Sequence, residues 1–289
     1  MWWLLGLVGI SLIRWGLVSA RQALYPERHA LPGPPAASPS HTTHAVIAPD
    51  GASFDVWLLE PPSSRGHVLL CHGYYAGRSQ VMGIAEGLRE RGYAVALFEL
   101  RGHGERPGPC TFGVRESEDA VAVLEWWASR DSATRRTFGV LGLSMGAAVV
   151  CHAAARRPEI LAVVTDSAYC RLFPVLSRAI RQRYHLPAIP FAWVTWWCVE
   201  LALGRRLASY DPCALAPRLR QPLFAIQGGA DQRVQPHRAL AFYVRWAGPK
   251  ERWFDPCVPH VAMFAHDPRA YCDRVAAFFN RTLPQTSAG

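Results

Sequence analysis

The segment Gly142–Gly146, with the sequence Gly-Leu-Ser-Met-Gly, has the residue types and spacing best suited to chemistry. Residues 137–141 before it form a short apolar run typical of a strand, and residues 147–155 after it are mostly small residues typical of a helix. Glycine on both sides lets the backbone turn where a side chain would collide with the neighbouring elements. A sharp turn from strand to helix lifts a serine hydroxyl above a parallel sheet. Ser144 is therefore a candidate nucleophile, with a purely structural serine as the alternative.

Apolar runs that alternate with helix-like segments surround this serine. From residue 44 onward we expect two antiparallel strands, because Asp50-Gly51 marks a tight turn between alternating runs. Further strands are predicted over residues 67–71, 93–98, 138–143, 160–165, 223–227 and 251–254, and helices up to residue 90 and over residues 116–129, 145–156, 237–246 and 268–280. This alternation predicts an α/β fold with a mainly parallel sheet covered on both faces.

Residues 170–221 interrupt the alternation, since they contain helical apolar runs but no strand pattern. An insertion of this length between two strands is usually functional. It includes the aromatic-rich run 191–197 (Phe-Ala-Trp-Val-Thr-Trp-Trp). Two interpretations stay open: a helical pair buried on the main core, or a lid whose aromatic face lines an apolar substrate pocket.

These motifs resemble the α/β-hydrolase superfamily. Besides Ser144, the resemblance rests on His72-Gly73, residues 101–104 (Arg-Gly-His-Gly), residues 228–231 (Gly-Gly-Ala-Asp) and His260. It covers roughly residues 44 to 283 and is closest to the bacterial serine hydrolases of the serine aminopeptidase-like and acylglycerol lipase-like branch. It implies the α/β-hydrolase fold with residues 170–221 as a helical lid.

The resemblance implies a Ser-acid-His order along the chain. A serine hydroxyl needs a base, and the base needs a carboxylate to orient it. Asp231 follows a predicted strand in a glycine-rich turn and His260 follows the last predicted strand, so the expected triad is Ser144, Asp231 and His260. The alternatives are Asp166 at the same sheet edge, Asp211 as a helix cap, and His237 and His266 as other bases.

The same resemblance implies an oxyanion hole formed by two backbone amides. One is the amide of Met145, directly after the nucleophile, and the other is that of Tyr74, in the loop after His72-Gly73. Two positions depart from the pattern: Glu99 replaces the usual aspartate, and Pro259 stands where glycine commonly precedes the histidine. The first departure concerns loop packing, and the second constrains the loop of His260.

The N-terminal residues 1–20 are apolar apart from Arg14 and two serines. Their length suits a membrane span and their tryptophans suit its interfaces, so we expect a single N-terminal anchor. A cleaved signal ending at residues 18–20 and a helix docked on the globular domain are the alternatives. Residues 21–43 are then a linker and residues 44–289 the hydrolase domain. Arginines on the C-terminal side of the anchor place that domain in the cytoplasm, with an exported form as the alternative.

The chain of 289 residues has a net charge of +9, which comes almost wholly from arginine because Lys250 is its only lysine. The arginines are scattered and no nucleic-acid motif occurs, so we interpret the charge as a solvated surface with a bias toward anionic membranes and not as a nucleic-acid site. The eight cysteines lack metal-site spacing, and a Cys257–Cys272 bridge is one option. No phosphate-binding loop occurs, and we expect neither cofactor nor metal.

The sequence therefore predicts a membrane-anchored serine hydrolase that cleaves a carboxylic ester or thioester with an apolar acyl group, through an acyl-enzyme intermediate. A peptidase or an acyltransferase of the same fold is an alternative, because a triad does not specify the leaving group. A non-catalytic, membrane-attached interaction protein is the alternative from a different class.

Overall fold

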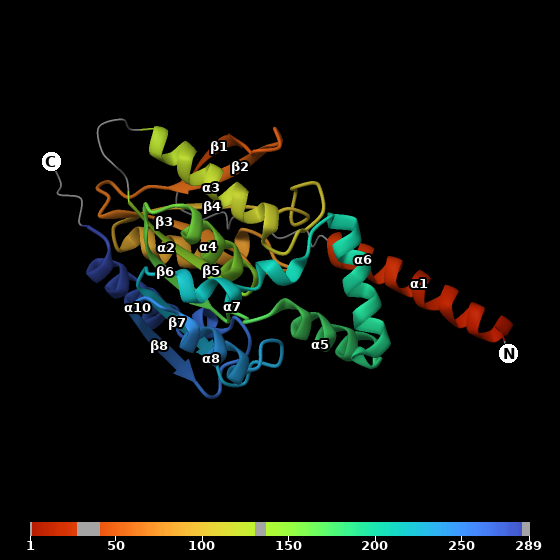
Figure 1. The fold of residues 1–289 in the computed structure, drawn as a ribbon. Helices are drawn as coiled ribbons and strands as arrows, with labels where there is room; N and C mark the ends of the chain where they lie inside the picture. Colours follow the sequence, from red (N-terminus) through yellow and green to blue (C-terminus); the bar gives the residue numbers. More distant parts are fainter. Residues whose placement is uncertain (1, 28–40, 131–136, 285–289) are drawn as a thin grey trace.

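The computed structural model describes residues 2–27, 41–130 and 137–284 of the chain. These residues form an eight-stranded sheet with the order β1-β2-β4-β3-β5-β6-β7-β8. β2 pairs antiparallel with β1 and with β4, and every other neighbouring pair is parallel. Helices lie on both faces of the sheet (Figure 1). The predicted α/β fold with a mainly parallel sheet is confirmed.

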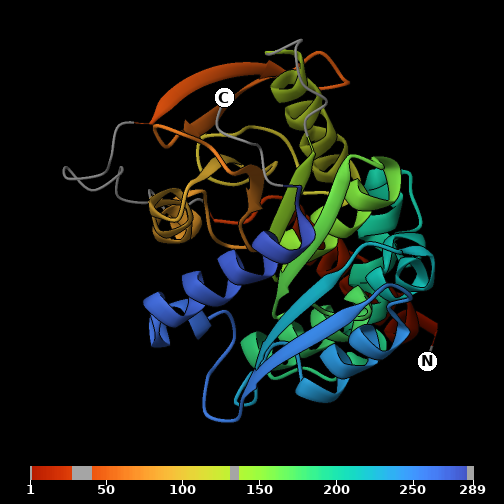
Figure 2. The same ribbon diagram turned by 90° about the vertical axis from the view of Figure 1, so that its left-hand side faces the viewer.

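The strands become more apolar toward the middle of the sheet. They are β1 (Thr42–Ile47), β2 (Ser53–Leu59), β3 (Gly66–Cys71), β4 (Tyr93–Phe98), β5 (Phe138–Leu143), β6 (Ile160–Asp166), β7 (Leu223–Gly228) and β8 (Lys250–Asp255). Every residue of β4 and β5 is buried, because helices cover both faces of a parallel sheet. The polar strand β8 lies at one edge, opposite β1 at the other (Figure 2). Charged side chains at an edge oppose pairing with another chain.

Two groups of helices bury the two faces of the sheet. On one face lie α2 (Ser79–Glu90), α9 (Met263–His266) and α10 (Pro268–Thr282), and on the other α3 (Val114–Ser129), α4 (Met145–Arg156) and α8 (Pro236–Arg245). β5 supplies both layers by alternation: Phe138 and Val140 join the α3–α4 layer, and Leu141 and Leu143 join the α2–α10 layer. Period-two alternation thus gives each face its own apolar core.

The parallel strands end together at one edge of the sheet. Cys71 of β3 pairs with Gly142 of β5, and Leu143 pairs with Asp166 of β6. Asp166 pairs in turn with Ile226 of β7. The loops after these strands therefore meet at this edge, where ligands bind in open α/β sheets.

The insertion between β6 and β7 is helical, as predicted for residues 170–221. It contains α5 (Leu172–Tyr184), the irregular turn η1 (Ala188–Ala192), α6 (Trp193–Leu203), η2 (Leu207–Tyr210), α7 (Pro212–Leu215) and η3 (Ala216–Arg218). α7 packs against α4, whereas α5 and α6 extend beyond the sheet (Figure 1). The insertion is therefore part core cover and part projecting arm.

A disulfide between Cys170 and Cys213 joins the two ends of the insertion. Leu172 N–H also donates to the Asp211 carboxylate at 2.8 Å, so Asp211 ties α5 to the start of α7. Cys257 and Cys272 are free thiols, and the bridge considered between them is not formed. The sequence could not reveal the actual pair, because its cysteines are 43 residues apart and only the fold brings them together.

The N-terminal helix α1 (Trp2–Leu24) packs along α6 and enters the domain with its C-terminal end (Figure 1). Ser19, Ala20 and Leu24 are buried, and the Leu24 carbonyl accepts the amide hydrogen of Cys110 at 2.7 Å. The helix thus extends four residues into the expected linker, and residues 28–40 of that linker lie outside the described residues.

The single N-terminal membrane span expected over residues 1–20 has no support from the structure. Among the described residues, no one helix combines the length and apolarity of a span, and only α5 together with residues 188–203, bent by 113°, reaches both. The C-terminal end of α1 is instead docked on the domain, where Ala20 and Leu24 are buried.

Candidate active site

Ser144 occupies the sharp turn between β5 and α4. Its backbone has φ 52° and ψ −109°, a conformation that side-chain-bearing residues rarely adopt. A Cβ atom on Gly142 would lie 2.2 Å from the Gly146 carbonyl oxygen, and one on Gly146 would lie 2.2 Å from the Cys71 carbonyl oxygen. Both glycines are therefore required by close backbone approach, and the turn predicted from their spacing is the one observed.

His260 lies between Ser144 and Asp231. Its Nε2 is 3.0 Å from Ser144 Oγ, and its Nδ1 is 2.6 Å from Asp231 Oδ2. An ionised carboxylate only accepts hydrogen bonds, so Nδ1 carries the ring proton and the Nε2 lone pair faces the serine hydroxyl. The ring is thereby set to accept a proton from Ser144.

The Asp231 carboxylate is buried and held by donors from its own turn. Oδ1 accepts the amide hydrogens of Arg233 and Val234, both at 2.8 Å, and Oδ2 accepts from Gln227 Nε2 at 3.1 Å. These bonds hold the carboxylate at the end of β7, where it can orient the His260 ring. A rigid acid is what a histidine base needs to keep one tautomer.

Asp166, the second candidate for the acid, lies beneath the loop that carries His260. Ser167 Oγ donates to Asp166 Oδ1 at 2.9 Å and accepts the amide hydrogen of Val261 at 3.0 Å. Complete burial raises the pKa of Asp166 to about 6. The structure pairs Asp231 with His260 and gives Asp166 a place in the support of the loop.

His266, His237 and Asp211 lie away from the serine. His266 ends α9 and His237 lies in the first turn of α8, and both side chains are exposed. Asp211 bonds to Leu172 at the base of the insertion. The structure therefore brings together the three residues that the sequence favours.

The two residues predicted for the oxyanion hole both line the cavity at Ser144. Met145 begins α4, and Tyr74 follows Gly73, which lies against Ser144. The Tyr74 hydroxyl donates to the Ala23 carbonyl at 2.7 Å, so its ring is fixed against α1. The stabilising role of the two amides stays a prediction.

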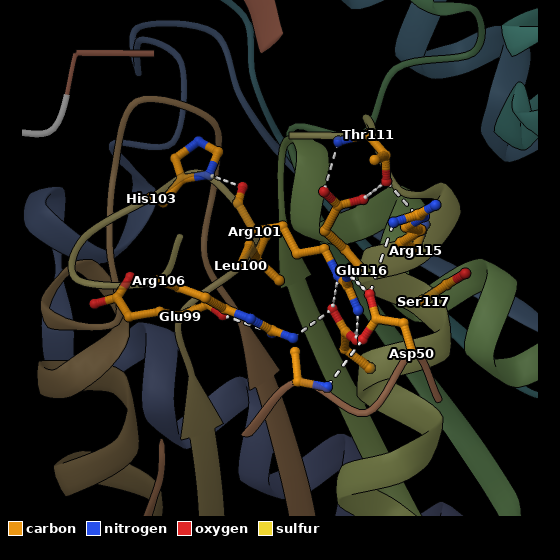
Figure 3. A network of polar contacts seen from close by, with 12 residues as sticks. Asp50, Glu99, Leu100, Arg101, His103, Arg106, Thr111, Arg115, Glu116 and Ser117 are labelled. Carbon is orange, nitrogen blue, oxygen red and sulfur yellow. Dashed lines mark hydrogen bonds and ion pairs between the residues drawn. The ribbon is translucent and has the colours of Figure 1, made fainter. Parts of the chain in front are cut away.

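A network of buried charges holds the loop after β4, at residues 99–106 (Figure 3). Arg101 makes two hydrogen bonds of 2.7 Å with Asp119, and Arg106 also pairs with Asp119, at 2.8 Å. His72 lies beside it: its Nε2 accepts the Leu100 amide hydrogen at 3.0 Å, so its Nδ1 carries the proton and donates to the Gly73 carbonyl at 2.8 Å. The two bonds of the His72 ring thus join the turn at Gly73 to the loop after β4.

Glu99, which departs from the family pattern, belongs to this support. Burial acts to raise the pKa of Glu99, but the nearby His72 ring and Arg78, whose amide donates to Glu99 Oε1 at 3.1 Å, outweigh burial and hold the pKa below its usual value. Arg106 Nη1 donates to the Glu99 backbone carbonyl at 3.0 Å. This agrees with the expectation that the departure concerns loop packing. Pro259 directly precedes His260, whose ring still reaches Ser144.

A cavity of about 490 Å³ opens beside Ser144 and His260. Its walls are mainly apolar and come from the insertion and from α1: Ala23, Leu172, Val175, Leu176, Ile180, Trp196 and Val199. Of the aromatic residues in the run 191–197, only Trp196 lines it, because Trp193 and Trp197 are exposed on the other side of α6. The expected aromatic lid is therefore largely aliphatic and is built from α5.

The contribution of α1 to the cavity was missed in the sequence. Gln22, Ala23 and Tyr25 line the cavity, although residues 21–43 were expected to be a linker. The apolar pattern of residues 1–20 indicates a helix, but only the packing against α6 tells where that helix ends. No local signal marks these three residues as part of a pocket.

The comparisons with known proteins agree with this fold. A family model described as the alpha/beta hydrolase fold matches residues 66–187. The structure of an esterase from Pyrococcus furiosus superposes with a TM-score of 0.74 at 26% identity, over 89% of this chain and 99% of that one. The chain therefore has the α/β-hydrolase fold.

Among its relatives is an uncharacterized protein of Mycobacterium tuberculosis, 27% identical over 95% of this chain and 91% of that protein. An acylaminoacyl peptidase from Pyrococcus horikoshii shares the fold with a TM-score of 0.65, at 16% identity over 86% of this chain and 43% of that one. At this identity the likeness to the peptidase shows the fold alone. The branch within the superfamily stays a prediction.

Proposed function

We propose that this protein is a serine hydrolase that cleaves carboxylic esters with apolar acyl groups. The observation that carries the proposal is the His260 ring, placed 3.0 Å from Ser144 Oγ and 2.6 Å from Asp231 Oδ2 at the wall of an apolar cavity. General base catalysis by a histidine requires a hydroxyl at one ring nitrogen and a carboxylate at the other, in this geometry. A histidine with a purely structural role does not require both.

In the first half-reaction Ser144 Oγ forms a bond with the ester carbonyl carbon, and its proton moves to His260 Nε2. Asp231 holds the ring and stabilises its positive charge. The amides of Met145 and Tyr74 donate to the oxyanion. The bond to the leaving oxygen then breaks, and that oxygen takes the proton from His260.

In the second half-reaction a water molecule attacks the acyl-enzyme carbonyl carbon, and His260 Nε2 removes a proton from that water. The bond to Ser144 Oγ breaks, the acid leaves, and the serine regains its proton from the ring. A thioester would follow the same steps with a thiol as leaving group. The cycle ends with the free enzyme, in which Ser144, His260 and Asp231 have regained their starting states.

The apolar cavity favours an ester of an apolar acid over a peptide or an acyl acceptor other than water. The Pyrococcus furiosus esterase, which matches this chain over almost its whole length, supports the same choice. The peptidase neighbour shares less than half of its own length with this chain and supports the fold alone. Peptidase and acyltransferase activity remain second candidates, and a non-catalytic interaction protein is the third.

We also propose that the N-terminal segment associates with a membrane, in keeping with the apolarity of residues 1–20. The Cys170–Cys213 disulfide supports the exported form over the predicted cytoplasmic one, because disulfides persist in oxidising compartments.

Hydrolysis of p-nitrophenyl esters from acetyl to dodecanoyl tests the proposed function. We expect turnover to rise with the length of the acyl chain until the cavity is full. Ser144→Ala should abolish turnover. Ser129→Ala, an exposed serine at the end of α3, is the matched control and should keep full activity. Absence of turnover with every ester, in folded protein, would contradict the proposal.

A further inference from the structure

α1 and α6 form one helical unit that projects from the sheet (Figure 1). Ser19 Oγ and Thr195 Oγ1 are 2.6 Å apart and buried. At Gly16 the backbones are so close that a Cβ atom would lie 2.5 Å from Val194 Cγ1 and 2.9 Å from Cys198 Sγ. Small residues at the contact therefore hold the two helices together.

The outer sides of both helices are exposed and apolar. We call these residues the α1–α6 surface: Leu7, Ile10, Ile13 and Leu17 on α1, and Trp193, Trp197 and Leu201 on α6. Trp197 is 63% exposed and Leu201 81% exposed. Exposed apolar side chains gathered on two helices that pack together indicate an interaction site.

Basic side chains accompany the α1–α6 surface. α1 contains no acidic residue, and Arg14 and Arg21 on it are exposed. Arg205 and Arg206 directly after α6 are exposed as well. Glu200, the acidic residue of α6, turns its carboxylate back to the amide of Leu207 at 2.8 Å. Tryptophan and leucine on a helix with arginine beside them fit the interface of an anionic bilayer.

The substrate cavity begins where the α1–α6 surface ends. Exposed residues at the C-terminal ends of α1 and α5, among them Gln22, Tyr25 and Arg183, line the cavity. Ser144 and His260 line it too. A path therefore leads from the base of the projecting helices to the serine.

We propose that the α1–α6 surface lies in the interface of an anionic phospholipid bilayer and that esters held in the bilayer enter the cavity from there. The entry of esters rests on the proposed hydrolase activity, and the contact with the bilayer deepens the proposed membrane association of the N-terminal segment. A second copy of the chain is disfavoured as occupant, because Arg14 lies among the apolar residues of α1 and would face its own charge across a symmetric contact.

Co-sedimentation of the full chain with vesicles tests the first half. We expect binding to vesicles of phosphatidylglycerol and phosphatidylcholine and weaker binding to phosphatidylcholine alone. Trp197→Glu combined with Leu201→Glu should weaken binding by about tenfold or more. Leu7→Glu combined with Ile10→Glu on α1 is the second variant, with the same expectation. Val244→Glu is the matched control, since Val244 is 62% exposed on α8, and it should bind as the parent does.

Two substrates separate the inference from the proposed function. All variants should hydrolyse a water-soluble short-chain ester at the parent rate, whereas the α1 and α6 variants should lose about tenfold on a long-chain monoacylglycerol embedded in anionic vesicles. Parent protein that hydrolyses the soluble ester but does not bind vesicles overturns the inference and the proposed membrane association, and leaves the proposed hydrolase activity standing. Vesicle binding without hydrolysis overturns the proposed function alone. A dimer that the variants break, without vesicle binding, identifies a second copy as occupant and also overturns the inference.

Discussion

The Tyr74 hydroxyl donates a hydrogen bond of 2.7 Å to the backbone carbonyl of Ala23. It joins the loop beside Ser144 to the N-terminal helix, so that the wall of the cavity and the candidate oxyanion hole are one unit. The next backbone carbonyl of the helix, that of Leu24, also bonds to a loop of the domain, since it accepts the amide hydrogen of Cys110. The N-terminal helix is therefore part of the candidate active site as well as a projecting arm.

Tyr74→Phe removes this bond and leaves the Ala23 carbonyl unsatisfied. We expect the free energy of unfolding to fall by about 1–3 kcal/mol. We also expect ester turnover to fall several-fold, since the loop beside Ser144 loses a tether. Urea denaturation and p-nitrophenyl ester hydrolysis measure the two effects. Tyr243→Phe, whose hydroxyl bonds to the Lys250 carbonyl on the surface, is the control, and an equal loss there would contradict the argument.

Asp231→Asn should lower kcat by about three to four orders of magnitude, because an amide in place of the carboxylate favours the wrong tautomer of His260. Asp166→Asn should have a much smaller effect, since its side chain acts on the loop through Ser167. Steady-state kinetics of both variants decide between them. A larger loss for Asp166→Asn would make Asp166 the acid.

Asp166 also gives a pH dependence of stability. Burial raises its pKa in the folded protein to about 6, above the ordinary value of 3.8, so folding favours the protonated form. Its stabilising contribution is present below about pH 4 and is lost as the pH rises through about 6. Over this range the free energy of unfolding falls by about 3 kcal/mol. The stability of Asp166→Asn relative to the parent should therefore increase between pH 4 and pH 7 in urea denaturation. A difference that does not change with pH would contradict the assignment.

The Cys170–Cys213 disulfide closes the insertion at its base. Replacing both cysteines by serine should lower the free energy of unfolding by about 2–4 kcal/mol, because the unfolded chain regains the freedom of a loop of 43 residues. KM for long-chain esters should rise, since α5 lines the cavity. Denaturation with and without reductant is the measurement: the parent should respond to the reductant and the double variant should not. Equal response of both would implicate other thiols.

Leu176→Trp should shorten the acyl chain that the cavity accepts, because Leu176 lines it from α5. We expect kcat/KM for long-chain esters to fall by about tenfold, which is a loss of about 1.4 kcal/mol in transition-state stabilisation. For acetyl esters kcat/KM should stay near the parent value. Leu240→Trp on α8, outside this cavity, is the matched control. A uniform loss across chain lengths would mean that Leu176 does not contact the acyl group.

Local sequence patterns predicted those features of the protein that depend on residues close together in the chain. The glycines around Ser144 predicted the turn, because close backbone approach at residues 142 and 146 allows nothing larger. The alternation of strands and helices predicted the sheet, and the chain order favoured Asp231 and His260. The catalytic roles of these residues stay a prediction.

Long-range packing decided the rest. Asp166 and Asp231 both follow parallel strands at the same edge, so only the fold tells which carboxylate reaches His260. The partner of Cys170 and the contact of α1 with α6 depend on residues far apart in the chain. For the same reason the sequence could not show which tryptophans of the run 191–197 face the cavity: Trp196 lines it, whereas Trp193 and Trp197 are exposed.

Reaction with a fluorophosphonate probe tests the central claim most directly, because the probe modifies only a serine activated by its neighbours. Peptide mass spectrometry of the folded protein should find one phosphonate adduct, on Ser144, and Ser144→Ala should carry none under the same conditions. Folded protein that remains unmodified, or an adduct that persists in Ser144→Ala, would contradict the account of Ser144 as nucleophile.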